Sequence, residues 1–493
     1  MDRDPPEGIA FASAPGRWVL GVAVLGSGLA FLDGTVVNVA LPEIGRDLDA
    51  STGALQWILN GYLLTLASLI LLGGSLGDRH GRRRIFVLGV GLFTAASALC
   101  AAAPNAETLV AARFLQGVGG ALLTPGSLAM IDSSFRPGDR ARAIGAWSGL
   151  SGVAAALGPL LGGYLVDAVS WRAIFLINLP IGAFVVVMAR RHVPETRDAS
   201  ATGPLDSRGA LLAALGLAGT AYALIEGPDD GVSPGVVLAG AGGVAALIAF
   251  VFAERRSANP MMPLGMFSSR QFRAANLVTF VVYAALGGVF FLLVAFLQIS
   301  LGYSAIAAGA ASVPVTALML ALSARSGALA QRIGPRIPLT LGPLVIAAGM
   351  LLMLRIDPGD GYVESVLPAV IVFGIGLTLV VAPVTATVLA AADAGHSGIA
   401  SGINNAVSRV AGLLAVAVLP LIAGLTGDAF YDPDAMADGF RTAMIACAAL
   451  SAAGGAVAWA TIRDDVLAAE PEFSCGVTGP PLRPGEPEPS RVA

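Results

Sequence analysis

Two residues of opposite charge lie deep inside apolar stretches of the sequence. Asp33 falls within residues 18–41 and Arg113 within residues 107–131. A charge in such a setting is costly, so it is expected to face a partner or a water-filled cavity. If both stretches are helices that cross a bilayer in opposite directions, each residue lies on the order of 10 Å below the same surface.

The shared depth of Asp33 and Arg113 allows them to form an ion pair. An aspartate beside an arginine keeps its negative charge, whereas an aspartate alone in apolar surroundings tends to bind a proton. Alternation between these two environments would let Asp33 load and release a proton. A static bridge that only holds two helices together is the alternative interpretation of the same pair.

A short segment between two apolar stretches combines glycines with charges. Its residues of interest are Gly74, Asp78, Arg79, Gly81, Arg82 and Arg83. The glycines allow close helix packing and a tight turn, the aspartate can pair with an arginine or accept hydrogen bonds from a helix N-terminus, and the arginines anchor a cytoplasmic face. Such a charged joint suits a gate with two states. Arginines that only set the orientation of the chain in a membrane are the alternative.

The composition indicates that membrane-spanning helices must position these residues. Of 493 residues, 56% are hydrophobic and 13% are charged, and the mean hydropathy is +0.77. A soluble domain has about 25% charged residues, so this chain cannot cover itself with polar surface. Because a helix needs about 20 mostly apolar residues to cross a bilayer, the sequence predicts an all-α integral membrane protein with fourteen spans, at residues 18–41, 54–76, 85–104, 107–131, 141–166, 173–190, 209–227, 232–253, 274–299, 306–325, 337–355, 364–390, 400–425 and 441–462.

The arginines predict the orientation of these spans. With a cytoplasmic N-terminus, eighteen arginines fall in the loops after the second, fourth, sixth, eighth and tenth helices, and four fall in loops on the other side. Arginine is enriched in cytoplasmic loops of membrane proteins. The asymmetry therefore predicts an even number of helices with both termini in the cytoplasm.

An internal repeat divides the chain. The spacing G-x-L-x-x-R-x-G occurs at residues 74–81 and again at 327–334, where Gln331 replaces the acid and a weaker joint is expected. The repeat predicts two six-helix bundles, 1–200 and 263–465, with two inserted helices in 201–262 and a disordered cytoplasmic tail in 466–493. Parallel repeats of this kind place a substrate site between the halves, near the middle of the membrane.

Two longer strings resemble a known family. The segment Leu32–Pro42 (LDGTVVNVALP) and the segment Trp171–Gly182 (WRAIFLINLPIG) are similar to signatures of the fourteen-helix drug:proton antiporter branch, EmrB/QacA type, of the major facilitator superfamily. The resemblance covers about residues 18–462. It implies the major facilitator fold and proton-coupled multidrug efflux.

The same resemblance extends to two shorter motifs. Arg113-x-x-Gln116-Gly117 resembles a motif associated with proton coupling. The string that contains Gly158, Pro159, Gly162 and Gly163 resembles the antiporter motif of the exporters. A proline and glycines in a helix permit a bend and a close contact with the opposite half, which could seal the cavity against proton leak. Simple small-residue packing is the alternative.

Candidate substrate contacts are polar or aromatic residues on helices expected to line the cavity: Asn38, Gln56, Asn60, Tyr62, Gln116, Phe290, Phe291, Gln298, Asn404 and Asn405. Packing or hydrogen bonds between helices could equally explain each of them. A dicationic substrate would find only Asp33 and Glu226, so we expect neutral or monocationic lipophilic substrates.

The expected function is a proton-coupled antiporter that exports small lipophilic drugs or antibiotics from the cytoplasm by alternating access. Proton-coupled uptake of a small metabolite, a non-transporting membrane sensor and a membrane-embedded enzyme are the alternatives. No nucleotide-binding G-x-x-x-x-G-K loop occurs, and the three histidines and three cysteines are scattered. We therefore expect no enzymatic activity, no metal, no cofactor and no nucleic acid. The expected partners are the lipid bilayer of a bacterial cell membrane and the substrate, and an outer partner protein stays open.

Overall fold

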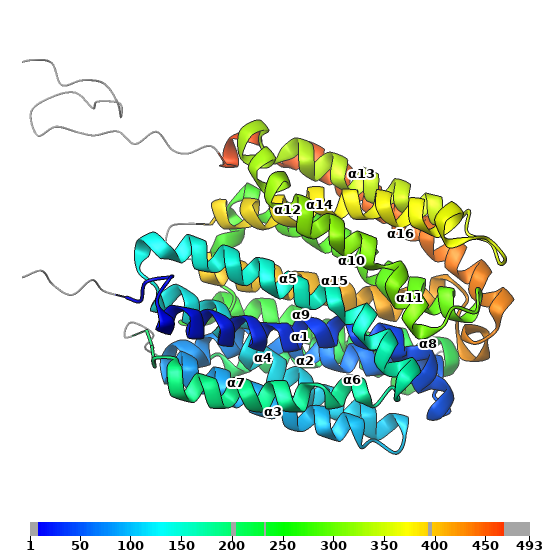
Figure 1. The fold of residues 1–493 in the computed structure, drawn as a ribbon, viewed down its shortest axis with the longest axis horizontal. Helices are drawn as coiled ribbons and strands as arrows, with labels where there is room; N and C mark the ends of the chain where they lie inside the picture. The colour runs from blue at the N-terminus through cyan, green and yellow to red at the C-terminus, as the bar shows by residue number, and fades with distance from the viewer. Residues whose placement is uncertain (1–7, 199–203, 231–232, 393–396, 468–493) are drawn as a thin grey trace, which may run out of the picture.

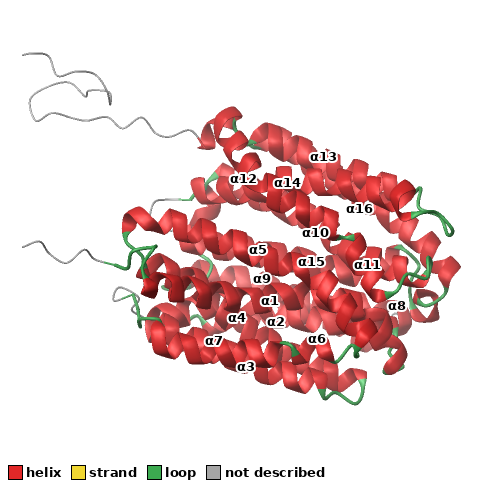
Figure 2. Ribbon diagram, viewed as in Figure 1, coloured by secondary structure: helices red, strands yellow, loops and turns green. Residues whose placement is uncertain are grey.

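The structure is a computed structural model that describes residues 8–198, 204–230, 233–392 and 397–467. Helices and the loops between them make up this part of the chain (Figure 2). Fourteen of the described helical spans are long and apolar enough to cross a membrane. The prediction of an all-α membrane protein with fourteen spans is therefore confirmed.

The first six spans are formed by seven helices. These are α1 (Ala14–Asp47), α2 (Thr52–His80), α3 (Arg82–Ala101), α4 (Ala106–Ser134), α5 (Pro137–Ala168), α6 (Ala173–Leu176) and α7 (Asn178–His192). The short α6 and α7 together make one span. Two further spans follow as α8 (Ser207–Asp230) and α9 (Pro234–Arg256).

The last six spans begin after a short 3-10 helix, η1 (Leu264–Ser268). They comprise α10 (Arg270–Ile299), α11 (Ala305–Ala311), α12 (Val313–Ile333), α13 (Arg336–Met353), η2 (Tyr362–Val366), α14 (Leu367–Ala390), α15 (Ser397–Ile422) and α16 (Pro433–Thr461). The pairs α11 with α12 and η2 with α14 each form one span. The 3-10 helices η3 (Gly427–Phe430) and η4 (Asp464–Leu467) flank α16. Most of the predicted tail lies outside the described residues.

Several helices are longer than the predicted spans, mostly at their C-terminal ends, and polar caps define where they begin. The side chains of Ser51, Asn105 and Ser304 each accept a hydrogen bond from a backbone N–H three residues further on. Such caps satisfy N–H groups that a helix start leaves without a partner. The predicted turn at 301–304 lies between α10 and α11, where Gly302 adopts a φ of +68°.

The helices pack as two bundles with the inserted pair at their junction (Figure 1). In the first half α4 packs against α2 and α3, and α1 packs against α5; in the second half α13 packs against α14 and α16, and α10 against α15 and α16. The inserted α8 contacts α2 of one half and α15 of the other, whereas α9 packs mainly on α8. A hydrogen bond of 2.8 Å from Trp57 Nε1 to Glu226 Oε1 ties α8 to α2.

The repeat is visible in the conformation of two turns. Gly81, between α2 and α3, has a φ of +110°, and Gly334, between α12 and α13, has a φ of +84°. A Cβ at Gly81 would lie 2.7 Å from the Glu195 carboxyl carbon, and one at Gly334 would lie 2.5 Å from Asp464 Oδ1. Each acid follows the last helix of its own half, after α7 and after α16. Both turns therefore combine a backbone that favours glycine with an acidic side chain in the same place.

The two halves meet most closely at one end of the bundle, which we call the closed end. It lies opposite the end at which both described chain termini lie, which we call the terminal end (Figure 1). At the closed end Tyr431 donates to Ala50 O at 2.7 Å, and Thr52 donates to Gly427 O at 2.9 Å. Burial raises the pKa of the Tyr431 hydroxyl to about 12, so this group keeps its proton at neutral pH.

Helices α5 and α11 form the tightest part of the closed end. Asp167, near the end of α5, accepts hydrogen bonds from the backbone N–H groups of Ala305 at 3.1 Å and Ile306 at 2.8 Å. A Cβ at Gly163 would lie 2.4 Å from Ala305 O, so the backbones of the two halves approach closely here. The Asp167 carboxylate thus binds the start of α11. Gly163 has no side chain and therefore allows the two backbones to approach.

We predict that Gly81→Ala lowers stability by about 1–2 kcal/mol, because alanine disfavours a positive φ and its methyl group would meet the Glu195 carboxyl. The measurement is the apparent unfolding temperature of the detergent-solubilised protein. Gly91→Ala is the matched control, since an added Cβ at Gly91 meets no heavy atom within 4 Å. Equal unfolding temperatures for the two variants would contradict the prediction.

We predict that Asp167→Ala opens the closed end, because it removes two charge-assisted hydrogen bonds between the halves, a loss of about 1–3 kcal/mol. Ala308 is fully buried, so a cysteine there, in a chain without its native cysteines, should react several-fold faster with a membrane-impermeant maleimide. Asp47→Ala is the control, because Asp47 pairs with Arg172 inside the first half. Unchanged labelling in Asp167→Ala would refute this role.

A buried polar network as the candidate functional site

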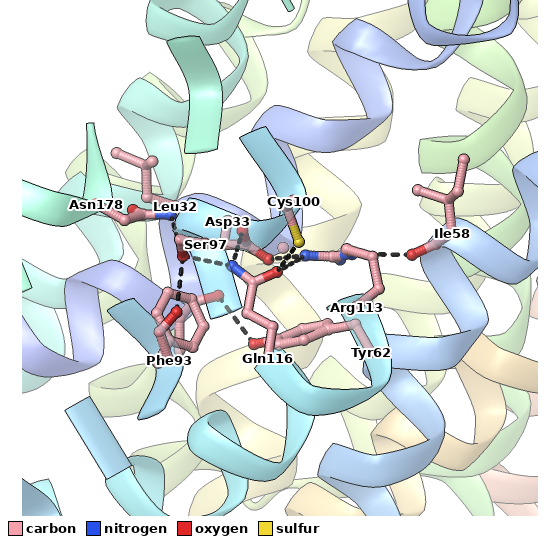
Figure 3. A network of polar contacts seen from close by, with 12 residues as sticks. Leu32, Asp33, Ile58, Tyr62, Phe93, Ser97, Cys100, Arg113, Gln116 and Asn178 are labelled. Carbon is pink, nitrogen blue, oxygen red and sulfur yellow. Dashed lines mark hydrogen bonds and ion pairs between the residues drawn. The ribbon is translucent and has the colours of Figure 1, made fainter. Parts of the chain in front are cut away.

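The structure brings Asp33 of α1 and Arg113 of α4 into direct contact. Arg113 Nη1 lies 2.6 Å from Asp33 Oδ2, and the two side chains are 0% and 1% exposed (Figure 3). The two charges therefore compensate one another in a place that water does not reach. Removing either partner would leave the other as an isolated buried charge, which costs several kcal/mol.

Gln116 joins this ion pair into a network. Its Oε1 accepts from Arg113 Nη1 at 2.6 Å, and its Nε2 donates to Asp33 Oδ1 at 2.8 Å and to Ser97 Oγ at 2.9 Å. Residues three apart on a helix share a face, so α4 presents the arginine and the amide together. Ser97 of α3 also accepts from Asn178 Nδ2 of α7 at 3.3 Å. Each carboxylate oxygen of Asp33 thus has its own donor.

The guanidinium of Arg113 is held on its remaining sides by α2 and α6. Its Nε donates to Ile58 O at 2.9 Å, and its Cζ lies 4.5 Å from the centre of the Tyr62 ring and 5.9 Å from that of Phe175. Cations over aromatic faces are stabilised, more so when desolvated. The arginine is therefore held by α2 and α6 in addition to Asp33.

This geometry links protonation of Asp33 to the surrounding contacts. A proton on Asp33 removes the charge that offsets Arg113 and leaves the hydrogen bond to Gln116 with a weaker acceptor. In this conformation the carboxylate is also sealed from solvent. Gain of a proton therefore requires both access and rearrangement of the network, which is the property a carrier that couples protons to a conformational change needs.

The charged segment that ends α2 and begins α3 lies at the terminal end and is tied to its own half. Asp78 pairs with Arg82 at 2.8 Å, and Arg83 lies 3.5 Å from the Glu195 carboxylate. A Cβ at Gly74 would lie 3.6 Å from Pro125 of α4, and Arg79 occupies the last turn of α2. In this conformation Asp78 takes the arginine partner that the sequence allowed.

The glycine and proline string of α5 contacts two different helices. A Cβ at Gly158 would lie 1.9 Å from Thr35 Oγ1 of α1, and one at Gly162 would lie 2.4 Å from Val36 Cγ2 of the same helix. Gly163 faces the start of α11, and a Cβ on Gly309 would lie 2.1 Å from Pro159 O. The string therefore packs α5 against the helix that carries Asp33 and also against the opposite half.

The predicted substrate contacts separate into three groups. Tyr62 and Gln116 belong to the network around Asp33. Others already bind protein: Gln56 donates to Val416 O at 2.7 Å and Gln298 to Val39 O at 2.9 Å, both between the halves, and Phe291 is buried against Phe430. Asn404 donates to Thr279 Oγ1 at 2.8 Å.

The remaining candidates have polar groups or surfaces that the protein does not fully use. Asn38 and Asn405 are half-buried, and Phe290 is 40% exposed. Asn60 is fully buried, and neither atom of its amide has a hydrogen-bond partner within the described residues. These four are the predicted contacts that stay open to a ligand or to a change of conformation.

Sequence reasoning overlooked three residues. Ser97 and Asp167 gave no signal, because a lone serine in a helix and an acid near a helix end are common. Arg409 did give one, as the single charge of the span that became α15. An ionisable residue within a span indicates a functional site by default.

Other sites in the described part of the chain do not compete with this network. A hollow of about 670 Å³ lies between α3 and α7 near the terminal end, away from Asp33, and is lined by residues that include Arg83, Arg84, Leu88, Leu92, Val186 and Arg190. No group of three His, Cys, Asp or Glu side chains that could hold a metal ion occurs among the described residues.

The chain is similar to bacterial resistance proteins over most of its length. A puromycin resistance protein of Streptomyces alboniger is 36% identical, covering 95% of this chain and 96% of that protein. A methylenomycin A resistance protein of Bacillus subtilis is 36% identical, covering 84% and 89%. A tetracenomycin C resistance and export protein of Streptomyces glaucescens is 36% identical, covering 87% and 81%.

Solved structures share the fold at low sequence identity. A bacterial homologue of the human lysosomal transporter Spinster, inward-facing and unoccupied, superimposes with a TM-score of 0.65 at 18% identity, covering 91% of this chain and 97% of that one. A peptide transporter POT superimposes with a TM-score of 0.66 at 16% identity, covering 93% and 98%. Residues 23–416 match the family described as Major Facilitator Superfamily. The chain therefore belongs to the major facilitator superfamily.

Proposed function

We propose that the protein is a proton-coupled antiporter that exports small lipophilic drugs or antibiotics from a bacterial cytoplasm by alternating access, without an enzymatic step and without a bound cofactor. The observation that carries the coupling is the sealed network of Asp33, Arg113 and Gln116. The resistance and export proteins to which the chain is similar support the direction of transport.

We assign the terminal end to the cytoplasm and the closed end to the outside. The arginine-rich segment around Arg82 lies at the terminal end, and arginine is enriched in cytoplasmic loops. Both termini are then cytoplasmic. The contacts at the closed end shut the protein toward the outside, so this conformation is the one that would accept cargo from the cytoplasm.

The proposed transport cycle opens and closes the terminal end and the closed end in turn. Cargo enters from the terminal end while Asp33 is paired with Arg113. Contacts such as that of Asp167 with the start of α11 then break, and the terminal end closes. Opening to the outside exposes the network, Asp33 binds a proton, and the cargo leaves. Return to the cytoplasm-facing state re-forms the ion pair and releases the proton inside.

Proton-coupled uptake of a small metabolite is the second candidate. The close packing of α5 against both α1 and α11 favours antiport, because it fills with backbone the space through which protons could leak at the closed end. Growth protection separates the two functions. An exporter lowers the intracellular level of its substrate and protects a sensitive host, whereas an importer raises that level.

We predict that Asp33→Asn inserts and folds but exports at least tenfold more slowly under a proton gradient, because the amide oxygen can still accept from Arg113 whereas the side chain cannot carry a proton. Puromycin, ethidium and anthracene-9-carboxylate are tested first for efflux from cells, and inverted vesicles then measure gradient-driven uptake of each exported compound. Asp47→Asn is the matched control, since it breaks an exposed ion pair of the first half. Wild-type transport rates in Asp33→Asn vesicles would refute the assignment of Asp33.

A further inference from the structure

Arg409 is a charge near the middle of α15 that the proton cycle does not use. It lies about 18 Å from either end of the helix at ~1.5 Å per residue, and it is the only charged residue of that helix. Its Nε is buried without a hydrogen-bond partner, and no acidic side chain in the described ranges forms an ion pair with it. A charge in this position is expected to face a partner or a water-filled cavity.

The contacts of its neighbours fix the direction in which Arg409 points. Leu413 and Leu414 belong to an apolar cluster with residues of α2 and α8. Asn404 donates to Thr279 of α10. With 3.6 residues per turn, Arg409 falls between the face of α15 that contacts α2 and the face that contacts α10. The guanidinium is therefore directed toward the junction of the two halves.

This face of α15 is partly open. A Cβ added at Gly398 or Gly412, one on each side of Arg409, would meet no heavy atom within 4 Å, whereas one at Gly402 would lie 2.8 Å from Leu71 of α2. Space and an uncompensated positive charge thus occur together near the middle of α15.

No acidic side chain inside the described spans is free to neutralise the positive charge of Arg409. The spans of the second half carry acidic residues only at their ends, such as Glu364 and Asp438. Asp33 is held by Arg113 and Gln116. With Asp33 ionised, the two central arginines and one acid leave one positive charge without a partner.

We propose that Arg409 binds an acidic group of the exported molecule, a carboxylate or another delocalised oxyanion attached to a lipophilic body. This inference rests on the proposed export function and names its substrate class. A guanidinium offers paired N–H donors that match a carboxylate. It replaces the expectation of neutral or monocationic substrates, which counted acids and overlooked this arginine.

The test compares two probes of similar shape, of which one carries a negative charge and the other is neutral. Anthracene-9-carboxylate and anthracene-9-carboxamide have nearly the same shape, and equilibrium dialysis against the purified full chain in detergent measures their dissociation constants at pH 7.5. Wild type is expected to bind the carboxylate about tenfold more tightly than the amide. Arg409→Gln is expected to abolish that preference while amide binding stays within twofold, and Arg409→Lys to keep part of it.

Arg355→Gln is the matched control, because it removes one arginine from the exposed end of α13; it should leave both constants unchanged. Equal binding of the two probes by wild type, no measurable binding of the carboxylate, or an equal loss for both probes in Arg409→Gln would each overturn the proposal. The measurement needs no proton gradient. A failure of export and a failure of anion binding are therefore distinguishable.

Discussion

The constraint on which the rest of the structure depends is the burial of a full negative charge inside a membrane protein. Asp33 is tolerated because Arg113 and Gln116 each donate to one of its oxygens. Holding those donors requires α2 for the arginine, α3 for the serine that binds the amide, and α6 and α7 behind them. The packing of the first half is thus organised around one carboxylate, and a change of its charge disturbs most of that half at once.

The polar contacts inside the second half differ from those inside the first, so the protein is asymmetric despite its repeat. The turns at Gly81 and Gly334 match in conformation and in the acid that approaches them. In the interior, however, the second half pairs neutral groups, as in the contact of Asn404 with Thr279, and adds Arg409. At the closed end the two halves touch through a few hydrogen bonds that involve backbone atoms, each worth about 1–3 kcal/mol, and through close backbone packing. A small sum of such contacts suits two states of similar free energy.

The sequence was sufficient to predict features that depend on the position of a residue along its helix. It was insufficient to predict contacts that depend on the face of the helix on which a residue lies. Hydropathy located all fourteen spans, and depth alone matched Asp33 with Arg113. The tight turn at Gly81 could likewise be inferred from its neighbours. The bridging position of Gln116 and the contacts of Gln56 and Gln298 between the halves depend on which face of each helix meets which neighbour. Asp167 could not be found, because its partners are backbone N–H groups of a helix far away in the sequence.

The proposed proton site and the proposed anion site would together determine what drives transport. When Asp33 is ionised and an acidic molecule is bound at Arg409, the central charges balance, and the loaded form can change conformation with little cost in charge burial. After the anion leaves and Asp33 is protonated, neither Arg113 nor Arg409 has a negatively charged partner. Exchange of one monoanion outward for one proton inward moves two positive charges into the cell. Each charge gains about 2.3 kcal/mol per 100 mV, so the membrane potential would drive the return step along with the proton gradient.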